Sequence, residues 1–367
     1  MNARHLYIHV PFCSRRCSYC DFSIAVRREV PVAEYLGALK MELSGLKESV
    51  KSPLTTVYFG GGTPSKLGPD GISAMIATVA GIFEIDRHAE VTVEANPEDV
   101  TLQTVKAWKC AGVNRLSLGI QTFDDNALAW MHRTHSSADS RLAIETARDG
   151  GITNLSVDLI FALPENLNRS WADDLEKALK QAPDHISLYG LTIERGTPLG
   201  RWEASGKVRA ADEDGYSEQF LLAHSMVESA GLSHYEVSNF GRAGKRSQHN
   251  SAYWQGVPYV GAGPSAHSFD GTSRRWNVAP YAEWQSRLSS GKSVVAGAEQ
   301  LTVDNRRAEK VYLGLRTIDG YLAGAEDVSI ARRWQSEGWA TVENSVIRLT
   351  PEGWLRLDSL AAGLTGL

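Results

Sequence analysis

Residues 7–22 read YIHVPFCSRRCSYCDF, and the three cysteines in this stretch are the strongest indication of both fold and chemistry. Cys13, Cys17 and Cys20 have the spacing C-x3-C-x2-C and directly follow a β-type run over residues 6–12. Three thiolates on one short loop can hold one face of an iron–sulfur cube and leave its fourth iron without a protein ligand. An open metal position is typical of catalytic and ligand-binding sites. We therefore predict a 4Fe–4S cluster on these three residues.

Other interpretations of the cysteines stay open at this point. A zinc ion on the three thiolates would need a fourth ligand, which His9 or a more distant residue would have to supply. Chance clustering is a further alternative, but the chain has only 4 cysteines, which is also too few for a disulfide framework. The remaining one, Cys110, lies in a helical pattern, where we expect a small buried apolar side chain.

The composition is that of an ordinary globular chain. Of its 367 residues, 43% are hydrophobic and 22% are charged. The net charge of −5 argues against broad electrostatic binding to nucleic acid. There is no signal-peptide pattern and no uncharged apolar stretch of about 18 residues that would span a membrane. We therefore expect a cytoplasmic protein without a transmembrane segment, and leave peripheral association with a membrane open.

Six β-type runs alternate with helical patterns in the first half of the chain. The runs cover residues 6–12, 55–60, 90–95, 115–121, 154–161 and 185–193. Helical patterns cover residues 32–47, 101–112, 136–151 and 170–182. Repeated βα units favour a parallel sheet with right-handed crossovers. Six units are fewer than the eight of a closed barrel. The sequence thus predicts an α/β fold, an open partial (β/α)6 barrel over residues 1–235.

Two further regions follow the predicted barrel. Residues 236–299 are rich in Gly, aromatic residues, Ser and His, and we expect a functional connecting loop there. Residues 300–367 show a helix, then a helix–hairpin–helix pattern, which predicts a small α+β module of winged-helix type. The module has no basic stripe, so a packing or lid role is favoured over DNA binding.

Polar residues and glycines recur where the predicted strands end. Gly61, Gly62 and Thr63 follow the second strand, and consecutive glycines let a backbone approach a ligand closely. Glu94 and Gln121 end the third and fourth strands, Arg133 follows in the next loop and Asp158 lies in the fifth strand. Because the carboxyl ends of barrel strands carry the active site, these residues predict one shared ligand.

The cysteine loop resembles the signature of the radical SAM superfamily, with Tyr19 in the aromatic position of that motif. Members of this superfamily bind S-adenosylmethionine (SAM) at the open iron. Together HLYIHVPFC, GGGTP, VEANP, LSLGIQTF and VDLIFALP resemble oxygen-independent coproporphyrinogen III oxidases and the related HemW-type haem chaperones over nearly the whole chain. The resemblance implies a reductant such as a flavodoxin or ferredoxin. The SAM contacts that it implies are Tyr7, Tyr19, Gly61, Gly62, Thr63, Glu94, Gln121, Arg133 and Asp158.

Two departures separate the sequence from the oxidases. Oxidases have another cysteine shortly after the third ligand, where this chain has Asp21 and Phe22, and only five residues precede the first strand in place of an N-terminal extension. A positive feature is H-N-x-x-Y-W at residues 249–254, which resembles the haem-binding motif of the HemW group. It implies haem contacts at His249, Asn250, Tyr253 and Trp254, with His267 as the rival ligand. A hydrogen-bonded histidine in an aromatic loop is the open alternative.

The sequence therefore predicts a haem chaperone on a radical SAM scaffold. It would bind haem as cargo and transfer it to acceptor proteins, and it would carry a 4Fe–4S cluster and SAM. One alternative is an oxidase-type enzyme that oxidatively decarboxylates porphyrinogen propionates. Another is a radical SAM enzyme with a different substrate. Catalytic residues are not assigned, and coproporphyrinogen oxidase activity is not expected.

Overall fold

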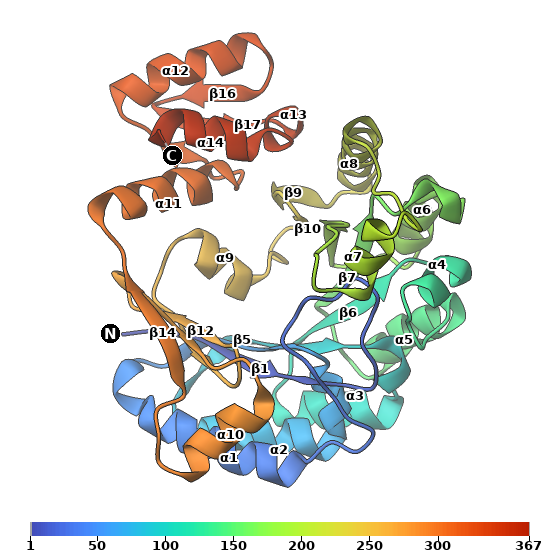
Figure 1. Ribbon diagram of the computed structural model, residues 1–367, viewed down its shortest axis with the longest axis vertical. Helices are drawn as coiled ribbons and strands as arrows, with labels where there is room; N and C mark the ends of the chain where they lie inside the picture. The colour runs from blue at the N-terminus through green and yellow to red at the C-terminus, as the bar shows by residue number, and fades with distance from the viewer. Residues whose placement is uncertain (1, 367) are drawn as a thin grey trace.

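The computed structural model describes residues 2–366; Met1 and Leu367 lie outside the described residues. Its centre is a nine-stranded sheet in the order β11-β1-β4-β5-β6-β7-β8-β10-β9 (Figure 1). Six neighbouring strands are parallel and correspond to the six predicted runs. These strands are β1 (His5–Val10), β4 (Leu54–Gly61), β5 (Ile85–Ala95), β6 (Arg115–Gln121), β7 (Leu155–Phe161) and β8 (His185–Gly190). Within residues 2–366 the sheet stays open, so the predicted partial barrel is confirmed.

Helices cover one face of this sheet, as the βα pattern predicts (Figure 1). The four predicted helices are present as α1 (Val32–Gly45), α3 (Leu102–Ala111), α5 (Ser137–Asp149) and α6 (Trp171–Lys180). In α3, Thr101 caps the first turn by accepting from the Thr104 amide, and Gly112 ends the helix with φ at 112°. The prediction for Cys110 on this helix is wrong, because its side chain is exposed.

Several short elements complete the barrel region. The strands β2 (Phe12–Cys13) and β3 (Ala25–Val26) pair with each other and frame the cysteine loop. The additional helices are α2 (Gly68–Ala80), α4 (Asp125–Trp130), α7 (Pro198–Ala204) and α8 (Glu213–Ser229).

The loop predicted after residue 235 is instead built of short elements. Three short strands here extend the main sheet: β11 (Val260–Ala262) runs parallel to β1, β10 (Asn239–Gly241) runs antiparallel to β8, and β9 (Ser233–Glu236) runs antiparallel to β10. Strands of three residues leave little pattern in a sequence, because their pairing partners, and not their own propensity, stabilise them. The other elements are α9 (Gln248–Trp254), β12 (His267–Phe269), β13 (Ser273–Asn277), α10 (Tyr281–Ser289) and β14 (Val295–Gln300).

The C-terminal module has the predicted α+β pattern and lies over the open side of the sheet (Figure 1). Its hairpin turns at Asn344 and Ser345, both with positive φ, which is typical of a two-residue turn. Trp354 anchors the module internally by donating to the Leu315 carbonyl at 3.0 Å. The elements are α11 (Val303–Leu315), β15 (Tyr321–Leu322), α12 (Ala325–Ser336), β16 (Ala340–Glu343), β17 (Val346–Leu349), α13 (Pro351–Trp354) and α14 (Leu357–Thr365). Across residues 2–366, none of the helices has the length and apolarity needed to cross a bilayer.

Candidate functional site

A cavity of about 460 Å³, here called the cysteine cavity, lies at the carboxyl ends of the parallel strands. Cys13, Cys17 and Cys20 all line it. Eight of the nine residues expected to contact SAM line it as well: Tyr19, Gly61, Gly62, Thr63, Glu94, Gln121, Arg133 and Asp158. The structure thus brings together residues that lie up to 145 positions apart, counted from Cys13 to Asp158. Their convergence is what a single bound ligand requires.

The three cysteines offer the donor set of an iron–sulfur cluster. Within residues 2–366, no three His, Cys, Asp or Glu side chains converge on a point where one metal ion would bind. An iron–sulfur cube takes its thiolates at separate corners. Burial raises the pKa of Cys20 to about 11 and also raises that of Cys13. Metal binding would therefore release protons from these thiols. The donor set fits a 4Fe–4S cluster.

Arg133 places a buried positive charge beside the sulfur atoms. Its Nη1 lies 3.6 Å from the Cys17 Sγ, and its Nη2 donates to Asn96 Oδ1 at 2.8 Å and to the Gly119 carbonyl at 2.9 Å. Burial by itself lowers the pKa of Arg133, but the nearby Tyr19, Cys17 and other acidic groups raise it above the usual value. The guanidinium therefore stays charged and lies directly beside the Cys17 sulfur.

Two carboxylates occupy the strand ends on the other side of the cysteine cavity. Glu94 accepts from the Tyr58 hydroxyl at 2.8 Å and from the Gly61 amide at 3.0 Å. Burial raises the pKa of Glu94 to about 7. Asp158 accepts from Ser117 Oγ at 3.0 Å, and burial raises its pKa too. Carboxyl groups with raised pKa values in a cavity are candidates for ligand contact.

The glycine run has a packing role that the sequence pattern does not reveal. A Cβ on Gly61 would lie 2.6 Å from the His9 ring, and this residue has φ at 113°. A Cβ on Gly62 would lie 2.7 Å from the Pro11 carbonyl. The glycines therefore let the end of β4 pack directly against the segment that leads into the cysteine loop.

The sequence pattern did not single out several polar residues of this cavity, among them Asn96, Ser117 and Tyr189. Asn96 orients Arg133, and Ser117 orients Asp158. All three lie in or directly after parallel strands, which is the signal that would have found them. Gln121 also lies at the end of a parallel strand, β6. Its φ is 68°, which is a strained backbone conformation for a residue other than glycine.

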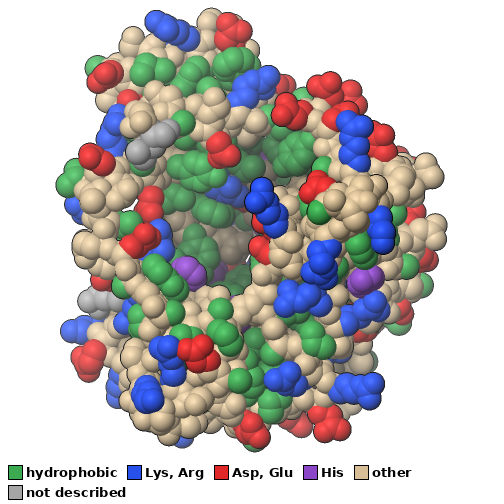
Figure 2. Space-filling view, viewed as in Figure 1, with side chains coloured by type: hydrophobic (Ala, Val, Ile, Leu, Met, Phe, Trp, Pro, Cys, Tyr) green, Lys and Arg blue, Asp and Glu red, His purple; other side chains and the backbone are tan. Residues whose placement is uncertain are grey.

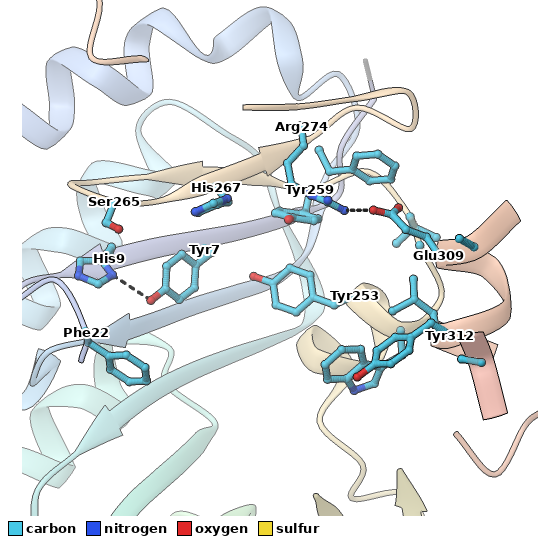
Figure 3. Close-up of a pocket in the computed structure, with 18 of the residues that line it drawn as sticks. Tyr7, His9, Phe22, Tyr253, Tyr259, Ser265, His267, Arg274, Glu309 and Tyr312 are labelled. Atoms are coloured by element: carbon cyan, nitrogen blue, oxygen red, sulfur yellow. Dashed lines mark hydrogen bonds and ion pairs between the residues drawn. The ribbon is translucent and has the colours of Figure 1, made fainter. Parts of the chain in front are cut away.

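A second, larger cavity of about 1080 Å³ lies between the sheet and the C-terminal module. We call it the aromatic cavity. Figure 2 shows the hollow on this face of the molecule, with hydrophobic side chains inside it. Figure 3 shows its main side chains, and the ion pair between Arg274 and Glu309 that joins β13 to α11 at 2.9 Å. The lining includes Tyr7, His9, Phe22, Tyr253, Trp254, Tyr259, Ser265, His267, Phe269, Arg274, Glu309 and Tyr312.

The two cavities adjoin. Asp21, Phe22, Gly61 and Glu94 line both of them. Phe22 is 61% exposed, which is unusual for a large apolar side chain and places it at the junction. A ligand in the cysteine cavity would therefore lie next to any occupant of the aromatic cavity.

Only some of the residues expected to contact haem line the aromatic cavity. Tyr253, Trp254 and His267 line the aromatic cavity, whereas His249 and Asn250 do not. His249 is 1% exposed, and both its ring nitrogens lie within hydrogen-bonding distance of hydroxyl groups. Burial lowers its pKa to about 3, so the imidazole is neutral. Tyr7 also departs from its expected place, because it lines the aromatic cavity and not the cysteine cavity.

Fold and cavity together define a protein of the radical SAM class. The sequence profile described as the Radical SAM superfamily matches residues 7–179. The chain belongs, more narrowly, to the HemW family. It is 34% identical to "Heme chaperone HemW" of Mycobacterium tuberculosis, with 98% of this chain and 94% of that protein covered. The Bacillus subtilis protein of the same name is also 34% identical, with 86% and 83% covered.

The chain is also similar to a mitochondrial protein and to a solved structure. The mouse protein "Radical S-adenosyl methionine domain-containing protein 1, mitochondrial" is 40% identical over 71% of this chain and 60% of its own length. Among solved structures, the radical SAM coproporphyrinogen III oxidase HemN of Escherichia coli has a TM-score of 0.82, with 98% of this chain and 89% of that chain covered. At 21% identity, that likeness extends to the fold alone.

Proposed function

We propose that this chain is a haem chaperone that carries a 4Fe–4S cluster and SAM. The cluster would be held by Cys13, Cys17 and Cys20, with SAM beside it in the cysteine cavity. Haem would occupy the aromatic cavity as cargo and pass from there to acceptor proteins. The role that the HemW relatives have by name supports the cargo. SAM chemistry would depend on a one-electron reductant such as a flavodoxin or ferredoxin.

The observation that carries this proposal is the pair of adjoining cavities with different linings. The cysteine cavity is lined by thiols and polar strand ends, which suit a cluster and a polar cofactor. The aromatic cavity is larger and offers flat faces from Tyr253, Trp254 and Tyr259, which suit a porphyrin. Arg274 on its wall suits the propionates of haem, because a guanidinium binds carboxylates through two parallel hydrogen bonds.

The C-terminal module supplies a means of release. Arg274 pairs with Glu309 on α11, so a haem propionate would compete with the module for the same guanidinium. Haem entry would then loosen the contact between β13 and α11, and haem departure would restore it. This competition links the cargo to the position of the module, which covers the open side of the sheet.

A pair of tryptophan variants tests the proposed cavity. Trp254 lies under the Arg316 guanidinium at 4.3 Å and lines the aromatic cavity, whereas Trp339 lies under Arg356 at 4.9 Å and does not. Trp254→Ala should weaken haemin binding about tenfold or more, since a buried aromatic face contributes roughly 1.5–3 kcal/mol. Trp339→Ala should leave the affinity unchanged. Equal affinities for the wild type and Trp254→Ala would contradict haem binding in this cavity.

A further inference from the structure

The N-terminus of helix α9 is fixed to the sheet. The buried carboxylate of Glu90 accepts from the Gln248 amide at 3.1 Å and from the His249 amide at 3.0 Å. Ser247 caps the same turn by accepting from the Asn250 amide. Because these contacts hold the backbone, a turn of helix α9 that brought His249 into the aromatic cavity would have to break them.

Neighbouring side chains occupy both nitrogens and one face of the His249 imidazole. Its Nδ1 lies 2.7 Å from Thr56 Oγ1 and its Nε2 lies 2.8 Å from the Tyr253 hydroxyl. The ring also stacks on Tyr58, with centroids 5.0 Å apart. An axial imidazole needs a free nitrogen lone pair directed at the iron. His249 offers none toward the aromatic cavity.

Tyr253 lies one helical turn further along α9, on the same face as His249. It does line the aromatic cavity, and Figure 3 shows its ring among the cavity side chains. A tyrosine oxygen is an established type of axial ligand for ferric haem. A hydrogen-bond acceptor behind the phenol would help it to give up its proton and would fix the oxygen in place.

We propose that Tyr253 supplies the phenolate oxygen that ligates the ferric iron of haem, and that His249 is a positioning residue behind it. This inference depends on the proposed function, in which haem occupies the aromatic cavity. It reverses the roles that the H-N-x-x-Y-W pattern implies, because the histidine serves the tyrosine and does not touch the iron.

The hydrogen bonds around His249 provide a path for the phenol proton. An iron–oxygen bond forms, the O–H bond of Tyr253 breaks, and the water or chloride on that side of haemin leaves; the iron stays ferric. The Tyr253 proton passes to His249 Nε2, and the proton on His249 Nδ1 moves to Thr56 Oγ1. The hydroxyl proton of Thr56 then moves to His5 Nδ1, which lies 3.0 Å from Thr56 Oγ1. His5 is only part-buried and can release the proton to water.

Tyr7 forms the other tyrosine–histidine pair of this cavity and is the natural comparison. Its hydroxyl lies 3.2 Å from His9 Nδ1, while His9 Nε2 lies 2.9 Å from the Ser23 carbonyl. A carbonyl accepts a hydrogen bond but cannot pass a proton onward. The proton path from Tyr7 therefore stops at His9, whereas the path from Tyr253 continues beyond His249. This difference favours Tyr253 as the residue that loses its proton and ligates the iron. His267 is the remaining rival, with an exposed ring on β12 that stacks on Trp276.

Resonance Raman spectra of the ferric haem complex test the assignment. The wild type should show the iron–phenolate stretching bands. Tyr253→Phe should lose them and weaken haemin binding at least about tenfold, whereas Tyr7→Phe should keep the bands. His249→Leu should shift the bands and speed haem release, and His249→Gln, which restores an acceptor, should reverse both changes. A residue that only stabilised the fold would not produce a shift that a new acceptor reverses.

The other outcomes separate the two proposals. Phenolate bands that persist in Tyr253→Phe and vanish in Tyr7→Phe would overturn the assignment. Imidazole signatures that are lost in His267→Ala or His249→Leu would also overturn it. In each of these cases haem still binds, so the proposed function survives. A wild type that takes up no stoichiometric haem would remove the proposed function itself.

Discussion

Glu42 on α1 is the residue whose replacement should most weaken the wall of the aromatic cavity. It is 6% exposed and accepts three hydrogen bonds: from the Gly263 amide at 2.8 Å, from Asn277 Nδ2 at 2.6 Å and from Trp284 Nε1 at 2.9 Å. These donors come from the region that carries His267. One buried carboxylate thus fastens this region to the barrel.

Glu42→Ala should lower the free energy of unfolding by about 2–6 kcal/mol. Each buried donor left without an acceptor costs roughly 1–3 kcal/mol, and Asn277 retains a second partner in the Gly263 carbonyl. Total stabilities are about 5–15 kcal/mol, so the loss should be large enough to lower haemin affinity too. Denaturant unfolding followed by near-UV circular dichroism measures it. Glu48→Ala, at an exposed position, is the matched control.

The pH dependence of this effect has a definite sign. Burial raises the pKa of Glu42 from 4.5 to about 7, so between these values the folded state binds more protons than the unfolded state. The contribution of Glu42 to stability is therefore complete below pH 4.5 and falls as the pH rises through 7. Glu42→Gln should then destabilise the protein less at pH 8 than at pH 5. A loss below about 1 kcal/mol in Glu42→Ala, or no pH dependence in Glu42→Gln, would rule out this role of the Glu42 carboxylate.

Two further predictions concern the cofactors. Anaerobic reconstitution should introduce about four iron and four sulfide per chain, and replacement of all three loop cysteines by Ala should remove them. The control variant Cys110→Ala should keep them. Stoichiometric zinc in the reconstituted wild type would contradict the cluster. Arg274→Gln should weaken haemin binding about tenfold by removing the partner of a propionate, while Arg332→Gln on the surface of α12 should have no effect in the same titration. Undiminished affinity in Arg274→Gln would remove Arg274 from the haem site.

The barrel could be predicted from the sequence because its strands lie in continuous apolar runs. Leu6, Ile8 and Val10 on β1 are all wholly buried, as the run over residues 6–12 implies. The polar strand ends followed from the same pattern, since parallel strands bring their carboxyl ends to one edge. Glu94 and Asp158 could thus be assigned to one cavity without coordinates.

The region after residue 235 could not be predicted in this way. Its strands are short and gain their stability from β1 and β8, which lie far away in the sequence. The environment of His249 was hidden for the same reason, because Thr56 and Glu90 that enclose it come from β4 and β5. A motif gives the residue types present, but burial decides which of them reaches a ligand.

The proposed function requires that haem is the cargo of this protein and that porphyrinogen is not its substrate. One anaerobic preparation with its cluster, SAM and a reductant can be divided between two assays. We predict that one portion binds about one haem per chain and that the other leaves coproporphyrinogen III unchanged. Rapid conversion of coproporphyrinogen III to protoporphyrinogen IX, without stoichiometric haem binding, would contradict it.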